Sequence, residues 1–291
     1  MTAENRFRSD VPNQWCPGCP NFGILAAMQQ ALLALELQPE QVCLVSGIGQ
    51  AAKFPHYVRA HVFNGLHGRA LPAATGIAVA NPSLTTIVTS GDGDLYGEGG
   101  NHFLHTLRRN PDLTVVVHNN QIYALTKGQA APTTPRCEKT RLQVEGVEVD
   151  PAHMLATAIA HNCTFVARGF AGDIPALSDL LQQAIGHRGL SIVEVIQPCI
   201  TWGNHPIDWY REKLLPVGEE HDPTDRLRTI ELALQAPERW ATGILYRTDP
   251  RPVFAESHFK RIDGRAMVDM PLVDRSILEE ELSKRRVSLS G

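Results

Sequence analysis

The 291-residue sequence has no long apolar segment, no strong excess of one charge and no internal repeats. No apolar run reaches the roughly 18–20 residues that a membrane-spanning helix needs, and residues 1–13 lack the apolar core of a secretory signal. The formal net charge of −4 gives no general electrostatic attraction to nucleic acid. We therefore expect a cytoplasmic protein that binds neither membranes nor nucleic acid.

Cysteine is sparse, with six residues in the chain, and only Cys16 and Cys19 lie close together in the sequence. Disulfides are uncommon in a reducing compartment, so a close Cys-X-X-Cys pair indicates a metal site or redox chemistry. By itself the pair fits a zinc site as well as an iron–sulfur cluster.

The composition is that of an ordinary globular protein, with 43% hydrophobic and 20% charged residues. The length suits one large or two small domains. Short apolar segments alternate with helical patterns through the first two-thirds of the chain. The expected strands are 41–46, 84–90, 113–118, 164–167 and 191–196, and the expected helices are 22–37, 71–80, 102–109, 151–160 and 174–185.

Continuously apolar strands separated by helices predict a mostly parallel sheet with helices on both faces, which is an α/β fold. We expect this domain to span residues 1–215. After about Pro216 the pattern becomes polar and contains a single helical segment, 224–234. Residues 216–291 are therefore expected to form a C-terminal extension that packs on the domain or on a partner subunit.

Four polar or glycine-rich clusters each follow an expected strand. They are GIGQAAK (47–53), GDGD (91–94), NNQIYALTKGQ (119–129) and QPCITWGNH (197–205). The carboxyl ends of strands in a parallel sheet are where ligands bind in this class of fold. The shared position of the four clusters is therefore more informative than any one of them alone.

The GDGD turn and the Asn-Asn pair together predict a magnesium site. Mg²⁺ prefers oxygen ligands from carboxylates, carbonyls and substrate phosphates. Asp92 offers a carboxylate, Asn120 offers an amide oxygen after the next strand, and Ile122 can add its backbone carbonyl. Gly91 and Gly93 allow the backbone to approach a diphosphate closely. Either half of the pattern alone would fit an ordinary tight turn.

The combination resembles the thiamine diphosphate motif, in which GDG is followed one strand later by Asn-Asn. The likeness continues along the chain in WCPGCPN (15–21), NGLHGRALP (64–72), GDGDLYGEGGNH (91–102), RRNPD (108–112), NNQIYALTKGQ (119–129), APTT (131–134) and QPCITWGNH (197–205). Over roughly residues 12–210 the sequence resembles the β subunit of the 2-oxoacid:ferredoxin oxidoreductases.

This resemblance implies an enzyme that oxidatively decarboxylates a 2-oxoacid, transfers the acyl group to coenzyme A and passes electrons to ferredoxin. The reverse reaction fixes CO₂. The resemblance implies thiamine diphosphate and Mg²⁺ as cofactors, and an α subunit that carries the pyrimidine-binding domain, so this chain alone should be inactive. Overall likeness favours 2-oxoglutarate as the substrate. The alternatives are a pyruvate-specific β subunit and a thiamine diphosphate decarboxylase-type subunit without a cluster.

The family also carries a [4Fe–4S] cluster held by cysteines. The resemblance assigns three ligands, Cys16 and Cys19 in the CPGC turn and Cys199 after a strand. Many members read GIGC where this sequence has Gln50, which is a poor iron ligand beside thiolate. Cys43 and Cys163 are expected in the core, and Cys137 lies in a loop, so the fourth ligand stays open.

By position and resemblance, the expected cofactor-binding residues are Gly47, Ile48, Gly49, His67, Gly91, Asp92, Gly93, Asp94, Asn120, Ile122, Tyr123, Leu125, Thr126 and Lys127. Lys127 can pair with phosphate or a substrate carboxylate, and Tyr123 and Leu125 are expected to wall the pocket. A solvated surface lysine is the ordinary alternative for Lys127.

Three residues are expected to serve the reaction itself. His67 is a candidate proton donor or polar contact at the reaction centre, because imidazole titrates near neutrality, and Arg69 lies two residues further on. Lys53 is expected at the mouth of the pocket, where an ammonium group would pair with the distal carboxylate of 2-oxoglutarate. The alternatives are a histidine bonded to backbone at a helix start and a solvated lysine.

Overall fold

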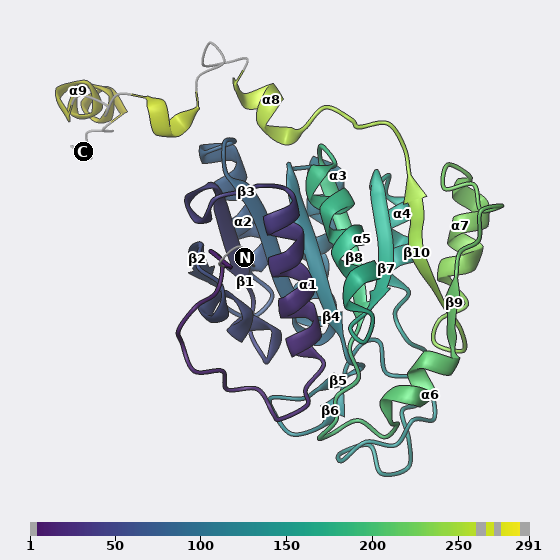
Figure 1. Cartoon of the computed structure of the whole chain (residues 1–291). Coiled ribbons are helices and arrows are strands. Elements are labelled where there is room, and N and C mark those ends of the chain that lie inside the picture. Colours follow the sequence, from purple (N-terminus) through teal and green to yellow (C-terminus); the bar gives the residue numbers. More distant parts are fainter. Residues whose placement is uncertain (1–4, 260–265, 271–274, 286–291) are drawn as a thin grey trace, which may run out of the picture.

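A computed structural model describes residues 5–259, 266–270 and 275–285 of the chain. Its core is one eight-stranded sheet with the order β2-β1-β3-β4-β8-β7-β10-β9 (Figure 1). The strands are β1 (Val42–Ser46), β2 (His61–Asn64), β3 (Thr85–Gly91), β4 (Leu113–Asn119), β7 (Phe165–Phe170), β8 (Leu190–Ile196), β9 (Leu214–Pro216) and β10 (Trp240–Arg247). Neighbouring strands pair in parallel except β10, which runs antiparallel to β7.

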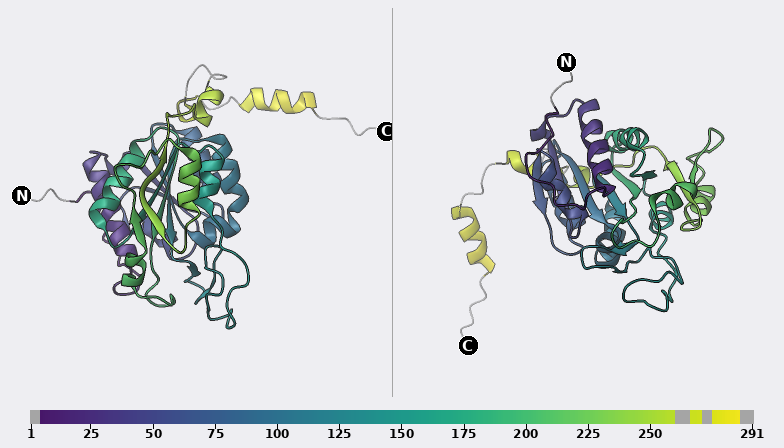
Figure 2. Two further views of the ribbon diagram at one scale, coloured as in Figure 1. Left: turned by 90° about the vertical axis from the view of Figure 1, so that its right-hand side faces the viewer. Right: turned by 60° about the horizontal axis from the view of Figure 1, so that its bottom comes forward.

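Helices cover both faces of this sheet, as the left view of Figure 2 shows. One face carries α1 (Asn21–Ala34) and α5 (Ile174–Gly186), and the other carries α2 (Ala70–Ala80), α3 (Gly100–Arg109), α4 (Met154–Ala160) and α7 (Arg226–Ala233). The predicted α/β fold with a mostly parallel sheet is therefore confirmed.

The central strand β4 shows why its apolar sequence forms a two-sided core. Every residue of β4 is buried. Val115 and Val117 join the apolar cluster beneath α2 and α3, whereas Val116 joins the cluster beneath α1 and α5. Successive side chains of a strand point to opposite faces, so a strand covered on both sides must be apolar throughout.

The predicted strands and helices are found within a few residues of their expected bounds, but β2, β9 and β10 of the main sheet were not predicted. β10 is the longest of these three strands. Its pairing with β7 is irregular between Ile244 and Tyr246, and Gly243 has φ +115°. A bulge breaks the two-residue periodicity by which a strand is recognised in a sequence. The sheet therefore continues past residue 215, and the expected start of the extension falls inside β9.

The short elements that follow the strands lie at one edge of the sheet. The turn after β3 continues into a π-helical segment, Gly93–Glu98, and β1 is followed by a 3-10 segment, Ala51–Tyr57. β5 (Ile122–Tyr123) and β6 (Gln129–Ala130) form a small hairpin below the ends of the main strands in Figure 1, and α6 (Ile207–Glu212) lies near it.

The C-terminal elements lie at the opposite edge of the sheet. α8 (Phe254–Phe259) and a 3-10 turn (Met267–Asp269) contact α2, whereas α9 (Arg275–Arg285) lies away from the sheet in Figure 1. Among the described residues, no helix combines the length and apolar character needed to cross a membrane.

Candidate active site

The carboxyl ends of β1, β3, β4 and β8 meet at one edge of the sheet, because these strands are parallel neighbours. A cavity of about 290 Å³ opens there, which we call the strand-end cavity. Among the residues that line it are Ile48, Gly49, His67, Gly91, Asp92, Gly93, Asp94, Asn120, Ile122, Tyr123, Leu125 and Thr126. All were expected to bind a cofactor. The fold brings them to one cavity although they lie up to 78 positions apart in the sequence.

Asp92 is the buried carboxylate of this cavity, with 1% of its surface exposed. It accepts hydrogen bonds from the hydroxyl of Thr133 and, at 3.4 Å, from the backbone N–H of Asn120. Burial raises the pKa of Asp92 to about 7, against the lowering effect of those two bonds. No basic side chain in the described chain forms an ion pair with it, so Asp92 is a buried acid suited to a cation.

Asp94, the second acid of GDGD, holds three segments together. Its carboxylate accepts hydrogen bonds from the Gly68 N–H at 2.7 Å, the Ser90 hydroxyl at 2.6 Å and the Ile48 N–H at 3.1 Å. These donors come from the segment before α2, from β3 and from the turn after β1. A β-carbon on Gly47 would lie 1.6 Å from this carboxylate, so glycine is required there for packing.

Gly93 is fixed by the ring of Tyr123 in a similar way. A β-carbon at Gly93 would lie 2.5 Å from the ring, and the Tyr123 hydroxyl donates to the Gly93 carbonyl at 3.1 Å. Burial raises the pKa of Tyr123, which keeps the phenol protonated. Tyr123 therefore covers the GDGD turn and forms part of the cavity wall.

Asn120 and Ile122 form one local turn. The Asn120 side-chain oxygen accepts from the Ile122 N–H at 3.1 Å, and its amide donates to Gln197 at 3.4 Å. An amide oxygen has two lone pairs, so this bond leaves one for a cation. Gln197 also lines the cavity but was not predicted, although it is the first residue after β8.

Four expected site residues lie outside the lining of this cavity. Lys53 is half-buried in the 3-10 segment after β1, and Arg69 and Lys127 are exposed. Lys53 lies three residues past Gln50, which does line the cavity, so the place of Lys53 at the pocket mouth stays a prediction. Gly47 supports the cavity through Asp94. His67 does line the cavity, and its side chain is exposed.

His118 is a lining residue that the sequence reasoning missed. It lies on β4 with 1% of its surface exposed, and its Nδ1 is 2.8 Å from the Asn21 side-chain oxygen. That oxygen can only accept, so Nδ1 carries the proton and Nε2 has a free lone pair. Burial lowers the pKa of His118 to about 3, so the ring is neutral. Its place one residue before Asn-Asn was the available signal.

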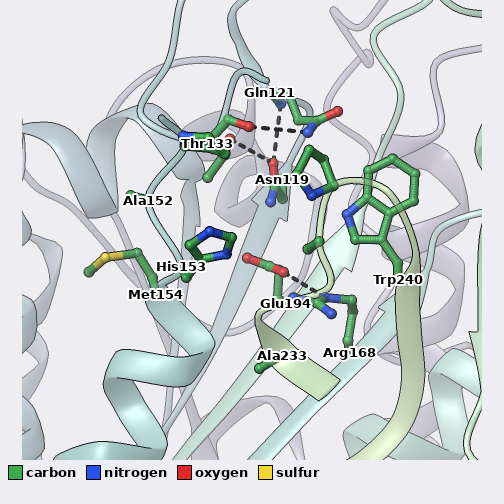
Figure 3. A pocket seen from close by; sticks show the side chains of 13 residues that line it. Asn119, Gln121, Thr133, Ala152, His153, Met154, Arg168, Glu194, Ala233 and Trp240 are labelled. Atoms are coloured by element: carbon green, nitrogen blue, oxygen red, sulfur yellow. Dashed lines mark hydrogen bonds and ion pairs between the residues drawn. The ribbon is translucent and has the colours of Figure 1, made fainter. Parts of the chain in front are cut away.

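A second, smaller polar cavity is lined by Asn119 at the end of β4, Arg168 of β7 and Glu194 of β8, with Met154 of α4 and Trp240 of β10 around them (Figure 3). The Thr133 hydroxyl is close to both Asp92 and the Asn119 side-chain oxygen, and Gln121 bonds to the Thr133 carbonyl at 3.1 Å. A hydroxyl has one proton, and the shorter of the two contacts, 2.5 Å against 3.0 Å, assigns that proton to the bond with Asp92. Thr133 is therefore a positioning residue for Asp92.

The floor of this polar cavity is a buried ion pair. Arg168 Nε lies 2.8 Å from Glu194, and both side chains are at most 5% exposed (Figure 3). The Tyr96 hydroxyl donates to the other Glu194 oxygen at 3.2 Å. Full pairing is what permits a charge to lie this deep in the fold. The Glu194 charge also contributes to the raised pKa of Asp92.

Three of the six cysteines line one further cavity, which we call the cysteine cavity. Cys16 and Cys19 reach it from the turn before α1, and Cys199 reaches it from the loop after β8. The charges of Cys199 and Cys16 both contribute to the raised pKa of Cys19, after burial as the main cause. The fold thus brings together Cys19 and Cys199, which lie 180 positions apart and which the resemblance assigned to one cluster.

The cysteine cavity adjoins the strand-end cavity. Gln50, Asn120, Ala124 and Gln197 line both. Within the described ranges, no group of three or more histidine, cysteine, aspartate or glutamate side chains is arranged to hold a single metal ion. The sulfurs instead bond weakly to neighbours, as where the Thr201 hydroxyl donates to Cys16 at 3.3 Å.

Comparison with known proteins agrees with this geometry. Residues 6–195 match a family model described as thiamine pyrophosphate enzyme, C-terminal TPP binding domain, and residues 199–261 match one that describes the C-terminal part of the pyruvate ferredoxin oxidoreductase beta subunit. The β subunit of a 2-oxoacid:ferredoxin oxidoreductase from Saccharolobus solfataricus is 49% identical over 81% of this chain and 82% of that protein. A counterpart from Aeropyrum pernix is 42% identical over 82% and 77%.

Two further similarities concern proteins named for 2-oxoglutarate. The 2-oxoglutarate oxidoreductase subunit KorB of Mycobacterium tuberculosis is 38% identical over 71% of this chain and 56% of that protein. A solved structure of 2-oxoglutarate:ferredoxin oxidoreductase from Magnetococcus marinus, with 2-oxoglutarate, coenzyme A and succinyl-CoA bound, superposes with a TM-score of 0.86 at 32% identity, covering 97% of this chain and 95% of that one. By its family models and its relatives, this chain belongs to the β subunits of the 2-oxoacid:ferredoxin oxidoreductases.

Proposed function

We propose that this chain is the β subunit of a 2-oxoglutarate:ferredoxin oxidoreductase, in which it holds thiamine diphosphate through Mg²⁺ beside an iron–sulfur cluster. The observation that carries the proposal is the shared wall of the strand-end and cysteine cavities. One cavity offers a buried acid for a cation, and the other offers three thiols. A protein that decarboxylates a 2-oxoacid and removes electrons needs both sites side by side.

Asp92, Asn120 and the carbonyl of Ile122 are the proposed Mg²⁺ ligands. The donor set is all oxygen, which suits Mg²⁺, and the buried acid gains most from a divalent cation. Thiamine diphosphate supplies the ring that accepts the electron pair left as CO₂ departs. This chain's part is to fix the diphosphate end through the metal, while Asp94 and Tyr123 keep the turn in place.

The remaining lining residues shape the space around the reacting atoms. His118 presents a neutral ring nitrogen as a hydrogen-bond acceptor, and His67 offers an imidazole side chain from the open side. Leu125 and Thr126 continue the wall from the loop after Tyr123. We propose that these residues orient the substrate and exclude water. His67 would in addition hold or pass a proton.

Cys16, Cys19 and Cys199 are the proposed thiolate ligands of the cluster. All three line one cavity, and the charges of the other two raise the pKa of Cys19, as closely spaced thiols do. Zinc would suit the Cys-X-X-Cys turn taken alone. An iron–sulfur cluster is favoured because the cavity shares its wall with the cofactor site and because the relatives are named for ferredoxin.

The proposed partner is an α subunit, which would supply the pyrimidine-binding part of the cofactor site. The edge strand β2 and the turn after it support an interface with another chain beside His67, because Val62, Phe63 and Leu66 are 48%, 47% and 73% exposed. An edge strand with exposed apolar side chains normally requires a cover. Ferredoxin as electron acceptor and coenzyme A as acyl acceptor follow from the proposed reaction.

The preference for 2-oxoglutarate rests on the names of the relatives. Lys53, whose ammonium group was expected to bind the distal carboxylate, lies outside the lining of the strand-end cavity. The alternative is a pyruvate-specific subunit, which the description of the family model over residues 199–261 favours. Either substrate uses the same two cavities.

The test is anaerobic co-expression with the α partner, followed by measurement of viologen reduction with 2-oxoglutarate or pyruvate and coenzyme A. We expect reduction that needs coenzyme A and is faster with 2-oxoglutarate. A complex that contains thiamine diphosphate and releases CO₂ without reducing viologen would instead support the cluster-free decarboxylase alternative. A preference for pyruvate would refute the substrate assignment alone.

A further inference from the structure

The wall between the two cavities contains a buried polar atom that lacks a partner. The side-chain oxygen of Gln50 is inaccessible to solvent and accepts no hydrogen bond from the described residues. Gln197, the other glutamine of the same wall, is bonded at both ends, to Asn120 at 3.4 Å and to Cys19 at 3.7 Å. A buried carboxamide oxygen without a donor is unfavourable unless another group satisfies it.

Gln50 is held beside the cysteine turn by its backbone. The indole N–H of Trp15, the residue before Cys16, donates to the Gln50 carbonyl at 2.9 Å. Trp15 is itself fixed by edge-to-face contacts with Phe22 and Tyr57, at 5.5 and 4.8 Å between ring centroids. Gln50 therefore lies in the cysteine cavity as a fixed part of it.

The remaining cysteines lie outside the lining of the cysteine cavity. Cys43 is a buried core residue of β1. Cys163 is fully buried before β7, and burial raises the pKa of its thiol to about 12, so it does not ionise near neutrality. Cys137 is exposed on a loop, where its N–H donates to the Val147 carbonyl at 2.8 Å. No fourth cysteine of the described residues lines this cavity, whereas Gln50 lines it and has a buried side-chain oxygen without a partner.

We propose that the cluster of this chain is held by three thiolates, and that its fourth iron faces the Gln50 carboxamide on the side of the strand-end cavity. This inference rests on the proposed function, since it requires the cluster. A neutral carboxamide oxygen binds iron more weakly than thiolate does. The iron on the Gln50 side would therefore be exchangeable.

One-electron oxidation tests the ligand set directly. A [4Fe–4S]²⁺ cluster with a weakly held iron loses it as [3Fe–4S]⁺ and Fe²⁺ form, and the released electron reduces one ferricyanide. A cluster with four thiolates resists this loss. The two products differ by electron paramagnetic resonance, because [3Fe–4S]⁺ is paramagnetic and [4Fe–4S]²⁺ is silent.

The experiment treats the anaerobic αβ complex with one equivalent of ferricyanide and measures bound iron and the paramagnetic signal. Wild type is compared with Gln50→Cys, which restores a fourth thiolate, and with Gln50→Ala, which removes the carboxamide. Cys137→Ser is the matched control for a fourth ligand from the loop. Thiamine diphosphate content, measured on each sample, shows that the complexes are folded.

We expect wild type and Cys137→Ser to lose one iron and gain the paramagnetic signal. Gln50→Ala should lose the iron at least as readily. Gln50→Cys should keep all its iron and give no signal. Wild type that keeps all its iron, as Gln50→Cys should, would overturn the proposal. A cluster that assembles only when Cys137 is present would overturn it as well. Iron that binds to Gln50→Cys and not to wild type would also overturn it. Absence of iron from every variant, with thiamine diphosphate retained, would instead refute the cluster in the proposed function.

Discussion

The strand-end cavity and the cysteine cavity share a wall but are built differently. The first is shaped by hydrogen bonds within the protein, such as the three that Asp94 accepts. The second lies between two loops, where the sulfurs of Cys16, Cys19 and Cys199 bond to neighbours at 3.3 to 3.7 Å. The difference suggests that the cofactor site keeps its shape when empty, whereas the cysteine site depends on the group it binds.

The substitution Asp92→Asn should have the largest effect on the strand-end cavity. It removes the charge that attracts Mg²⁺ and keeps the size of the side chain. We expect the affinity for Mg²⁺ and thiamine diphosphate to fall by more than about 100-fold, since even loss of a residue that supports a ligand costs about 10–100-fold. Calorimetric titration of the αβ complex measures this. Unchanged affinity would remove Asp92 from the metal site, and iron content serves as the internal control.

The converse substitution, Cys19→Ser, should affect the cysteine cavity alone. Loss of one of three thiolates should reduce bound iron to a small fraction of the wild-type value, while thiamine diphosphate still binds. Iron analysis and cofactor titration on one preparation measure both. If cofactor affinity fell together with iron content, the two sites would depend on each other, and the cofactor site would not keep its shape independently of the cysteine site. Cys43→Ser, in the core, is the matched control.

Thr133→Ala should have a smaller effect on the same metal site as Asp92→Asn. It removes the hydroxyl that donates to Asp92 without touching a metal ligand. We expect Mg²⁺ affinity to fall about 10–100-fold, as for other residues that orient a ligand. Thr133→Ser, which keeps the hydroxyl, should restore most of the affinity. Equal loss in both variants would point to packing of the Thr133 methyl group instead.

The smallest effect, taken per pH unit, is expected for the pH dependence of Mg²⁺ binding. Because burial raises the pKa of Asp92 to about 7, the carboxyl is protonated below that pH, and protons compete with the cation. Mg²⁺ affinity should therefore weaken as the pH falls below about 7, approaching tenfold per pH unit. Asp92→Asn should show no such dependence. An affinity that stays constant from neutrality down to the ordinary aspartate pKa would contradict the burial argument.

In the cofactor-free protein the raised pKa of Asp92 makes folding stability fall with rising pH, whereas Mg²⁺ affinity rises. A raised pKa in the folded state means that the folded chain binds more protons than the unfolded chain between the two pKa values. Stability should therefore decrease as the pH rises from the ordinary aspartate range towards 7. Mg²⁺ and thiamine diphosphate, by binding the ionised form, should offset this loss.

Much of the strand-end cavity could be predicted from the sequence, because its residues follow strands whose apolar pattern is unmistakable. Parallel strands bring their ends together whatever the distance in sequence, which is how Asp92 and Asn120 were placed. The roles of Asp94 and Thr133 could not be predicted, because they depend on which donors surround a buried acid. Lys53 stays a predicted site residue, because it lies in a 3-10 segment after β1, Ala51–Tyr57, outside the residues that line the cavity.

The cysteine cavity was predictable only in part. Cys16 and Cys19 lie three positions apart in the sequence, and Cys199 was assigned by resemblance before the structure placed it in the same cavity. The unsatisfied oxygen of Gln50 required the structure, since burial without a partner leaves no trace in sequence. β10 was missed because a bulge disrupts its alternation, although it pairs antiparallel with β7 in the main sheet.

The most direct measurement asks whether substrate at one cavity reduces the group in the other. The visible absorption of the cluster is followed in the anaerobic αβ complex, loaded with thiamine diphosphate and Mg²⁺, as 2-oxoglutarate is added. We predict bleaching on addition of substrate in wild type, and in Asp92→Asn only on addition of dithionite. A loaded wild-type complex that dithionite bleaches, but that neither 2-oxoglutarate nor any other 2-oxoacid bleaches, would contradict the link between the two cavities.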